Sequence, residues 1–351
     1  MSADKASYVI IGGSAAGMAA AQAITEEDPN GLITVLSEEP DMPYFRPLIP
    51  YLVTGKKSAG DMQMWGNGPY NGSGIDIHIN SRVDSVNVTE KTVSVKGRET
   101  IIYDKLLLAT GSRPYLPPEI KGSGANGVFA LRTLADARAM AERVSVTDHA
   151  VMLGGGLLNL KAAFALLERG VKVTLVVYSP EVLSQLMEPD DACLIRRALD
   201  EAGLEIKTGC GATGILSYKN GVSGVTLDDG SELPCQMICI GKGVRPNAEF
   251  LSGSKIIIDR GIVVNRYTAC NTPDTFAAGD VAVTFEPATG ERIMTGLWTN
   301  AVEMGRCAGH NMTGRKTAYS GTFGIMNATQ IADEPFVSMG IVHTRNSNYE
   351  V

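Results

Sequence analysis

The sequence predicts an α/β fold in which one Rossmann-like dinucleotide-binding domain is inserted within another. Two stretches carry this prediction, because "YVIIGGSAAG" (8–17) and "AVMLGGGLLN" (150–159) each combine a buried strand, a Gly-rich turn and the start of a helix. The parallel continues in 93–111 and 225–243, where a hairpin leads into a buried strand that ends in glycine. The same architecture therefore occurs twice in the chain.

The predicted domain boundaries fall at two proline-containing crossings, near 114–118 and 244–247. The expected order along the chain is the first domain, the second domain, and then the first domain resumed. We predict a first domain formed by 1–116 and 245–317, a second domain formed by 117–244, and the start of a further domain at 318–351.

Composition excludes several classes of partner. The chain has 351 residues, 44% of them hydrophobic, which is enough to bury a large core. Its net charge is −7 and no basic block occurs, so we expect neither nucleic acid nor an anionic membrane surface as a partner. The start, "MSADKASYVIIGG", lacks the features of a signal peptide, which predicts a cytoplasmic protein without a membrane span.

The cysteine pattern predicts neither a metal site nor an iron–sulfur cluster, because no CxxC or cluster-ligand spacing occurs. We expect these thiols to pack as small apolar groups. The six cysteines are Cys193, Cys210, Cys235, Cys239, Cys270 and Cys307.

The first Gly-rich turn fits the GxGxxG template at Gly12 and Gly17, with Ser14 in the middle position. Such a turn lets backbone amides and a helix N-terminus face a pyrophosphate. The next strand ends in Glu38 and Glu39, about twenty residues past the turn, where an acid hydrogen-bonds a ribose diol. These features predict a complete dinucleotide-binding βαβ unit.

Two further stretches indicate which dinucleotide binds there. In "YDKLLLATGSRPYLPP" (103–118) and "NTPDTFAAGDVA" (271–282), a hydrophobic strand delivers a turn that contains glycine. Together with the first turn, they resemble the flavin motifs of the FAD-dependent pyridine nucleotide-disulfide oxidoreductase superfamily. The resemblance covers nearly the whole chain, and it is closest to the rubredoxin reductase, NADH oxidase and nitrite reductase flavin-domain branch.

The resemblance implies an FAD site and assigns roles to individual residues. Asp280 bonds the ribityl chain or the pyrophosphate, while Gly279 allows close backbone approach. Arg46 lies beside the phosphates or ribose, and Val83 touches adenine through its backbone. The helix that starts near Trp298 points at the flavin, although core packing is an equal alternative for the Trp298 side chain. The remaining expected FAD contacts are Gly12, Ser14, Ala16, Gly17, Glu38, Glu39, Thr110 and Gly111.

The second Gly-rich turn is expected to bind NADH or NADPH. Gly154 and Gly156 fit the template, but Asn159 replaces the third glycine. We expect the cost of this change to be modest, because the phosphate-facing amides come from the turn itself. The next strand ends in Val177 and Tyr178, without an acid for the NADH ribose or a nearby arginine for a 2′-phosphate, which leaves the choice of nucleotide open.

Lys161 is the one candidate catalytic residue. Several relatives place a lysine from the loop after the second strand against a glutamate at this helix position, whereas this chain has Tyr51 and Lys161 there. The hypothesis is that Lys161 supplies a cation near the hydride-accepting nitrogen of the flavin. The alternative is a solvated helix lysine. Lys242, flanked by glycines at a strand end, is a second candidate for contact with a cofactor phosphate or the flavin, and its alternative is a solvated loop lysine.

The chain departs from the disulfide reductases of the superfamily, because no cysteine precedes Cys193 and the loop reads "RPLIPYLV". Thiol–disulfide chemistry is therefore not expected. We predict an FAD-dependent NAD(P)H oxidoreductase that passes electrons to an external acceptor: a rubredoxin, an iron–sulfur protein or a metalloenzyme subunit. One alternative is an assembly or electron-relay subunit of a redox complex with a degenerate NAD site. Another is a nucleotide-sensing interaction protein.

Members of the superfamily commonly finish with an interface domain of about a hundred residues that forms dimers. Only 39 residues follow Met312. We therefore expect 318–351 to be the start of that domain, cut short, and the sequence does not fix the oligomeric state.

Overall fold

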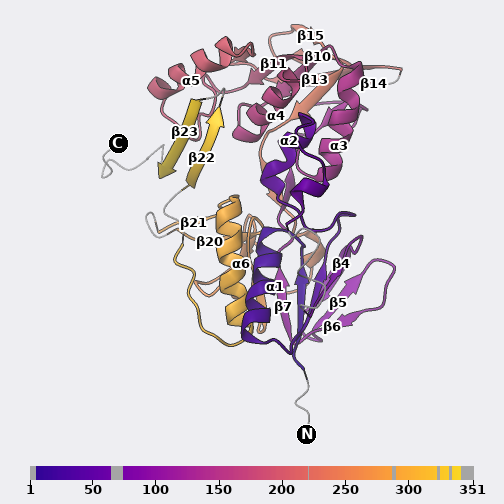
Figure 1. Ribbon diagram of the computed structural model, residues 1–351, viewed down its shortest axis with the longest axis vertical. Helices are drawn as coiled ribbons and strands as arrows, with labels where there is room; N and C mark the ends of the chain where they lie inside the picture. Colours follow the sequence, from indigo (N-terminus) through magenta and orange to yellow (C-terminus); the bar gives the residue numbers. More distant parts are fainter. Residues whose placement is uncertain are drawn as a thin grey trace. The chain divides into compact units, whose positions relative to one another are not determined.

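The computed structural model describes residues 5–64, 74–219, 221–286, 290–321, 325–331 and 334–340. These residues form two compact units, each assembled from three segments of the chain (Figure 1). Unit 1 comprises residues 1–45, 63–113 and 245–323, and unit 2 comprises residues 46–62, 114–244 and 324–351.

A parallel five-stranded sheet forms the centre of unit 1, in the order β19-β7-β1-β2-β3. Strands β1 and β7 are apolar runs because both faces of the sheet are covered. A small antiparallel sheet, β4-β5-β6, adds four valines to the same core. The strands of unit 1 are β1 (Ser7–Ile11), β2 (Leu32–Leu36), β3 (Ile75–His78), β4 (Val83–Asn87), β5 (Thr92–Val95), β6 (Ile101–Ile102), β7 (Lys105–Leu108), β18 (Ile262–Val263), β19 (Thr275–Ala277), β20 (Ala282–Phe285) and β21 (Arg292–Ile293). Its helices are α1 (Ala15–Glu27), η4 (Glu249–Leu251) and α6 (Trp298–Met312).

Unit 2 repeats this design with the parallel sheet β12-β11-β10-β16-β9. An antiparallel sheet, β13-β14-β15, and a C-terminal hairpin complete the unit. Its strands are β9 (Val128–Phe129), β10 (His149–Leu153), β11 (Lys172–Val177), β12 (Glu205–Thr208), β13 (Ala212–Tyr218), β14 (Gly221–Leu227), β15 (Glu232–Pro234), β16 (Met237–Ile240), β22 (Ile325–Ile331) and β23 (Glu334–Gly340). Its helices are η1 (Arg46–Leu48), α2 (Ile49–Val53), η2 (Gly60–Met62), α3 (Leu134–Arg143), η3 (Val144–Val146), α4 (Leu157–Leu167) and α5 (Pro189–Glu201).

The order of strands is the same in the two units. In each, the strand before the Gly-rich turn is central, the next two strands lie on one side, and the strand from the later hairpin lies on the other. The crossings between the units are β8 (Ser112–Pro114) and β17 (Val244–Pro246). The predicted α/β fold, with two Rossmann-like domains and one inserted in the other, is confirmed.

One segment clusters with a different unit from the one that its place in the sequence suggests. Residues 46–62 follow the second strand of unit 1, yet they cluster with unit 2. There Arg169 donates a hydrogen bond to the carbonyl of Val53, and Lys56 pairs with Glu168 at 2.6 Å. Part of the predicted further domain at 318–351, namely 322–324, 332–333 and 341–351, lies outside the described residues.

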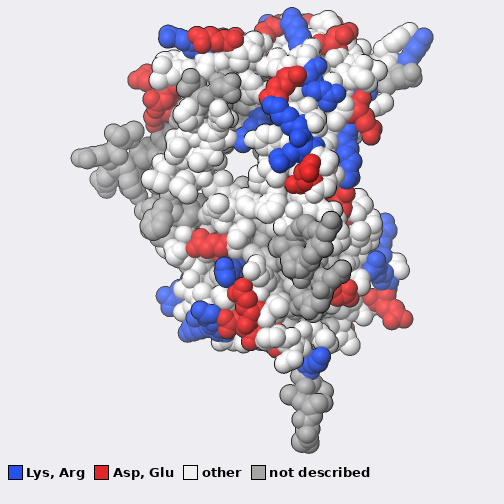
Figure 2. Space-filling view, viewed as in Figure 1, with Lys and Arg blue, Asp and Glu red and all other residues white. Residues whose placement is uncertain are grey.

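Acidic and basic side chains are interspersed on the face that Figure 2 presents. This distribution agrees with a chain that has no basic block and a net charge of −7. Within the described ranges, no helix is both long and apolar enough to cross a bilayer.

Helices α1 and α6 lie side by side in unit 1 and approach closely because small residues line their contact (Figure 1). A Cβ atom added to Gly305 would lie 2.1 Å from the carbonyl oxygen of Ala16. A Cβ on Gly309 would lie 2.6 Å from the carbonyl oxygen of Ala20. Backbone therefore packs against backbone along this seam, which fixes the position of the turn that precedes α1.

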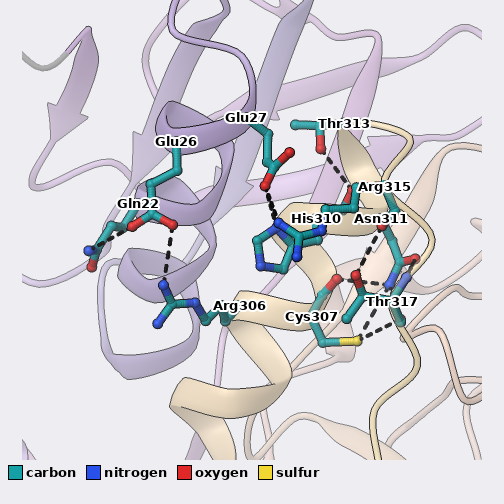
Figure 3. A network of polar contacts seen from close by, with 10 residues as sticks. All are labelled: Gln22, Glu26, Glu27, Arg306, Cys307, His310, Asn311, Thr313, Arg315 and Thr317. Carbon is teal, nitrogen blue, oxygen red and sulfur yellow. Dashed lines mark hydrogen bonds and ion pairs between the residues drawn. The ribbon is translucent and has the colours of Figure 1, made fainter.

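Polar side chains border the seam (Figure 3). Arg306 of α6 pairs with Glu26 of α1 at 3.2 Å. Glu27 accepts from Arg315 and lies 3.4 Å from Nδ1 of the nearly buried His310. These contacts join the C-terminal half of α6 and the residues after it to the end of α1. Neither helix has a side-chain hydrogen bond at its N-cap.

Replacing Gly305 with alanine is expected to destabilise the protein by about 3 kcal/mol, because the new methyl group meets the rigid backbone of α1. Chemical denaturation with matched m-values measures the change. Gly124→Ala is the control, since a Cβ there has no neighbour within 4 Å, and it should stay within about 0.5 kcal/mol of the unaltered protein. Equal stability of the two variants would contradict the close packing of α1 and α6.

Candidate functional site

The first Gly-rich turn lies between β1 and α1, and glycine is required on sterical grounds at two of its positions. Gly12 has a φ of +119°, and a Cβ there would lie 2.1 Å from the carbonyl oxygen of Ala109. A Cβ on Gly17 would lie 1.9 Å from the carbonyl oxygen of Gly12. Ser14 is the N-cap of α1, but its side chain makes no capping hydrogen bond. The first amides of α1 are thus available to an anion such as a pyrophosphate.

Two further turns meet beside the first: the ATG turn (109–111), which follows β7, and the AAGD turn (277–280), at the end of β19. They meet there because β7 is adjacent to both β1 and β19. Ser112 donates a hydrogen bond of 3.0 Å to a carboxylate oxygen of Asp280. A Cβ on Gly279, whose φ is +78°, would lie 3.1 Å from the Cβ of Ala16. Asp280, Ala16 and the first turn therefore converge at the carboxyl edge of the sheet, where Rossmann folds bind their ligands.

The ATG turn is itself held by an asparagine that sequence reasoning missed. The Thr110 hydroxyl donates to the carbonyl of Asn247 at 2.7 Å, and the Asn247 side chain donates to the carbonyl of Thr110 at 3.0 Å. The amide of Asn247 also donates to the carbonyl of Gly111 at 2.9 Å, and Gly111 has a φ of +65°. In the sequence, Asn247 stood out only as part of the second proline-containing crossing, 244–247. That pattern does not specify the hydrogen-bond partners of a side chain.

The two candidate ribose acids follow β2 and differ in their surroundings. Glu39 accepts a hydrogen bond of 2.5 Å from the Tyr44 hydroxyl. Glu38 is exposed and lies 3.5 Å from Arg82. Because an exposed ion pair is the one contact of this carboxylate among the described residues, Glu38 can reorient toward a diol at little cost.

The remaining predicted FAD contacts are Val83, Trp298 and Arg46. Val83 is a buried residue of β4 at a register shift, and Trp298 starts α6 with its ring centroid 5.8 Å from that of Phe45. Arg46 belongs to unit 2, where it donates a hydrogen bond of 2.8 Å to the carbonyl of Arg132. The residues that unit 1 brings together are Gly12, Ser14, Ala16, Gly17, Thr110, Gly111, Gly279 and Asp280.

The second Gly-rich turn, between β10 and α4, repeats the backbone conformation of the first at its first glycine. Gly154 has a φ of +114°, and a Cβ there would lie 2.3 Å from the carbonyl oxygen of Gly241. Gly156 is the N-cap of α4, and a Cβ there would have no neighbour within 4 Å. The surface of this turn is therefore open at the start of the helix, as a pyrophosphate requires.

The end of β11 carries neither of the groups that discriminate NADH from NADPH. Val177 is buried, and its two methyl carbons lie 3.1 Å from the position of a Cβ on Gly155. The next side chain, Tyr178, is 72% exposed. An apolar residue thus closes the turn where an acid would otherwise accept from the ribose.

Two lysines in unit 2 are half-buried. Burial lowers the pKa of Lys161, and no described residue forms an ion pair with its ammonium group. Burial also lowers the pKa of Lys242, partly opposed by Cys210 and Asp228. Because a half-buried cation without a partner is costly, Lys161 is better suited to meet an anionic ligand than to stabilise the fold.

The thiols are placed as structural groups. All six cysteines are free, and only Cys193 is exposed. Burial raises the pKa of Cys235, Cys239 and Cys270 to about 12, so these groups stay protonated and are poor nucleophiles. No group of three metal-ligating side chains occurs in the described part of the chain.

The fold and its two turns define a protein that binds two dinucleotides. The chain belongs to the pyridine nucleotide-disulphide oxidoreductase family, whose model matches residues 6–305. It is an FAD-dependent NAD(P)H oxidoreductase that transfers electrons, and the glycine cradles fit both nucleotides.

Similar proteins agree with this assignment. An NADH oxidase of Enterococcus faecalis is 28% identical over 90% of this chain and 72% of its own length. A rubredoxin-NAD(+) reductase of Ectopseudomonas oleovorans is 29% identical over 88% of this chain and 80% of its own length. The crystal structure of a covalent putidaredoxin reductase–putidaredoxin complex matches 96% of this chain and 81% of that one, with a TM-score of 0.89 and 25% identity.

Ser112→Ala should weaken FAD binding by about tenfold, because it removes a hydrogen bond to a charged carboxylate that orients Asp280. The dissociation constant is measured by titrating the apoprotein with FAD and following flavin fluorescence. Ser145→Ala, at an exposed serine of η3 that contacts only the backbone, is the matched control. If Ser112→Ala and Ser145→Ala bind FAD equally well, Ser112 does not orient the Asp280 carboxylate.

Proposed function

We propose that this protein takes a hydride from NADH or NADPH onto FAD and delivers electrons to an external protein acceptor. FAD, when bound, supplies the step from two-electron to one-electron chemistry. The chain supplies two pyrophosphate cradles, one built around Gly12 and Gly17 and the other around Gly154 and Gly156. The proposal assigns FAD to unit 1 and the nicotinamide nucleotide to unit 2, which follows the predicted division into 1–116 with 245–317 and 117–244 except for residues 46–62.

The observation that carries the proposal is the second turn. Gly154 keeps the positive φ and the close backbone approach that Gly12 has in the first turn, although the third glycine is replaced. A turn that had lost its ligand would have no reason to keep a conformation that disfavours every residue except glycine.

A protein acceptor is supported by the thiols and by the relatives. No cysteine is placed to form a redox disulfide, so a thiol–disulfide substrate lacks its nucleophile. The rubredoxin-NAD(+) reductase and the putidaredoxin reductase named above are similar proteins that act on small electron carriers. We therefore favour a rubredoxin, an iron–sulfur protein or a metalloenzyme subunit over oxygen.

Anaerobic stopped-flow mixing of the FAD-loaded protein with NADH and, separately, NADPH tests the proposal. Rapid loss of the visible flavin band with one of the two is the expected result, and it identifies the nucleotide. If neither bleaches a flavin that dithionite does reduce, the proposal fails. The alternative of an electron-relay subunit with a degenerate second site then takes its place.

Lys161 is proposed to act as a cation near the flavin. Lys161→Ala should slow flavin reduction at saturating nucleotide by at least about tenfold, since a desolvated positive charge strongly stabilises the negative charge that develops on the flavin. Lys161→Arg, which keeps the charge, should retain most of the rate. Lys172→Ala, at an exposed lysine of β11, is the control. An unchanged reduction rate in Lys161→Ala would leave Lys161 as a solvated helix lysine.

A further inference from the structure

The two turns can be compared atom by atom because the chain contains the same design twice. In the first turn the amide of Gly12 donates to Leu36 at 2.8 Å, and in the second the amide of Gly154 donates to Val176 at 2.8 Å. A further pair of backbone bonds is also equivalent. The amide of Ala109 donates to Ile11, and that of Gly241 donates to Leu153, each at 2.8 Å.

In the first turn the small residue is on the helix. Gly17 lies against the backbone of Gly12, where a Cβ would be 1.9 Å from the carbonyl oxygen. The neighbouring strand end carries an alanine, Ala109. The pair is therefore glycine on the helix and alanine after the strand.

In the second turn the small residue is on the strand. Asn159 replaces the third glycine and is buried, and Gly241 stands where the first turn has Ala109. A Cβ on Gly241 would lie 2.4 Å from Cγ, 2.5 Å from Oδ1 and 2.6 Å from Nδ2 of Asn159. The missing Cβ of Gly241 thus provides the space that the Asn159 side chain occupies.

The Asn159 side-chain amide forms hydrogen bonds through both its nitrogen and its oxygen in that space. Its Nδ2 donates to the carbonyl of Leu153 at 3.0 Å and to the carbonyl of Gly154 at 2.9 Å. Its Oδ1 accepts from the Cys239 thiol at 3.5 Å. Burial raises the pKa of Cys239 to about 12, so the thiol keeps the proton that it donates. Asn159 therefore connects α4 to β10 and β16.

These bonds fix the inner side of the turn. The carbonyl of Gly154 is taken by Asn159, and the carbonyl of Gly155 accepts from the amide of Leu183 at 3.1 Å. In the described residues, nothing accepts from the amides of Gly156, Leu157 and Leu158 at the start of α4, and the space beside Gly156 is open. With its carbonyls held on one side, the turn presents its amides on the other.

We propose that Asn159 is a positioning residue of the nicotinamide-nucleotide site, where its side-chain amide and Gly241 together replace the third glycine. Its hydrogen bonds to Leu153 and Gly154 hold the turn in the shape that receives the pyrophosphate. The substitution is a second solution to the same packing problem rather than a loss of the site. This inference rests on the proposed function, because it assumes that NADH or NADPH binds at this turn.

Binding of ADP-ribose to the FAD-loaded protein, measured by isothermal titration calorimetry, tests the inference without turnover. ADP-ribose carries the pyrophosphate but no nicotinamide, so it reports on the cradle alone. Asn159→Gly should weaken its binding by about tenfold or more, because glycine at both 159 and 241 leaves the space between helix and strand empty and three buried hydrogen bonds are lost. Lys172→Ala, at the exposed lysine that starts β11, should change it by less than about twofold.

The double variant Asn159→Gly with Gly241→Ala reproduces the pair found in the first turn. It should bind ADP-ribose within about threefold of the unaltered protein, because the alanine methyl refills the space that Asn159 vacates. The flavin spectrum and FAD content of every variant should remain unchanged, which shows that unit 1 is intact.

Wild-type affinity for ADP-ribose in Asn159→Gly would overturn the inference. This holds even if the melting temperature of the variant falls, because Asn159 would then stabilise the fold without positioning the turn. A double variant that binds no better than Asn159→Gly would also overturn it. Failure of the unaltered protein to bind ADP-ribose would instead reject the proposed function.

Discussion

The structure depends on the distance at which backbone can approach backbone around the two Gly-rich turns. In unit 1 the carbonyl of Gly12 faces Gly17, and the carbonyl of Ala16 faces Gly305, with no room for a Cβ at either glycine. A methyl group at these points would push α1 away from β1 or α6. Because the start of α1 forms the pyrophosphate cradle, the position of the cofactor follows from these contacts. The alanine-rich sequence of α1 and the glycines of α6 thus meet the same requirement, which is close backbone contact between the two helices.

The second turn meets the same constraint differently. Asn159 adds a side chain where unit 1 has none, and Gly241 removes one from the neighbouring strand end. The exchange conserves the space between helix and sheet and replaces a van der Waals contact with hydrogen bonds to Leu153 and Gly154. A GxGxxG template judges each position alone, so it scores this turn as defective. The physical requirement belongs to the pair of positions, and the pair satisfies it.

Much of the fold could be predicted from the sequence, because a strand, a Gly-rich turn and a helix within thirty residues leave few alternatives. The duplicated order of strands followed from the repeated hairpins, and the convergence of Thr110, Gly111 and Asp280 followed from their places at strand ends. The association of residues 46–62 with unit 2 could not be predicted, because it depends on long-range contacts such as Arg169 with Val53. The roles of Ser112 and Asn247 were missed for the same reason, since each partner lies more than 130 residues away.

The central claim is that one chain holds two dinucleotides at once, in two cradles of the same design. Native mass spectrometry of the FAD-loaded protein with NAD⁺ and with NADP⁺ tests it most directly, because the oxidised nucleotides bind without reducing the flavin. The account predicts a species whose mass equals the chain with one FAD and one of these nucleotides. A nucleotide that binds only by displacing FAD, or that does not bind at all, would contradict the claim.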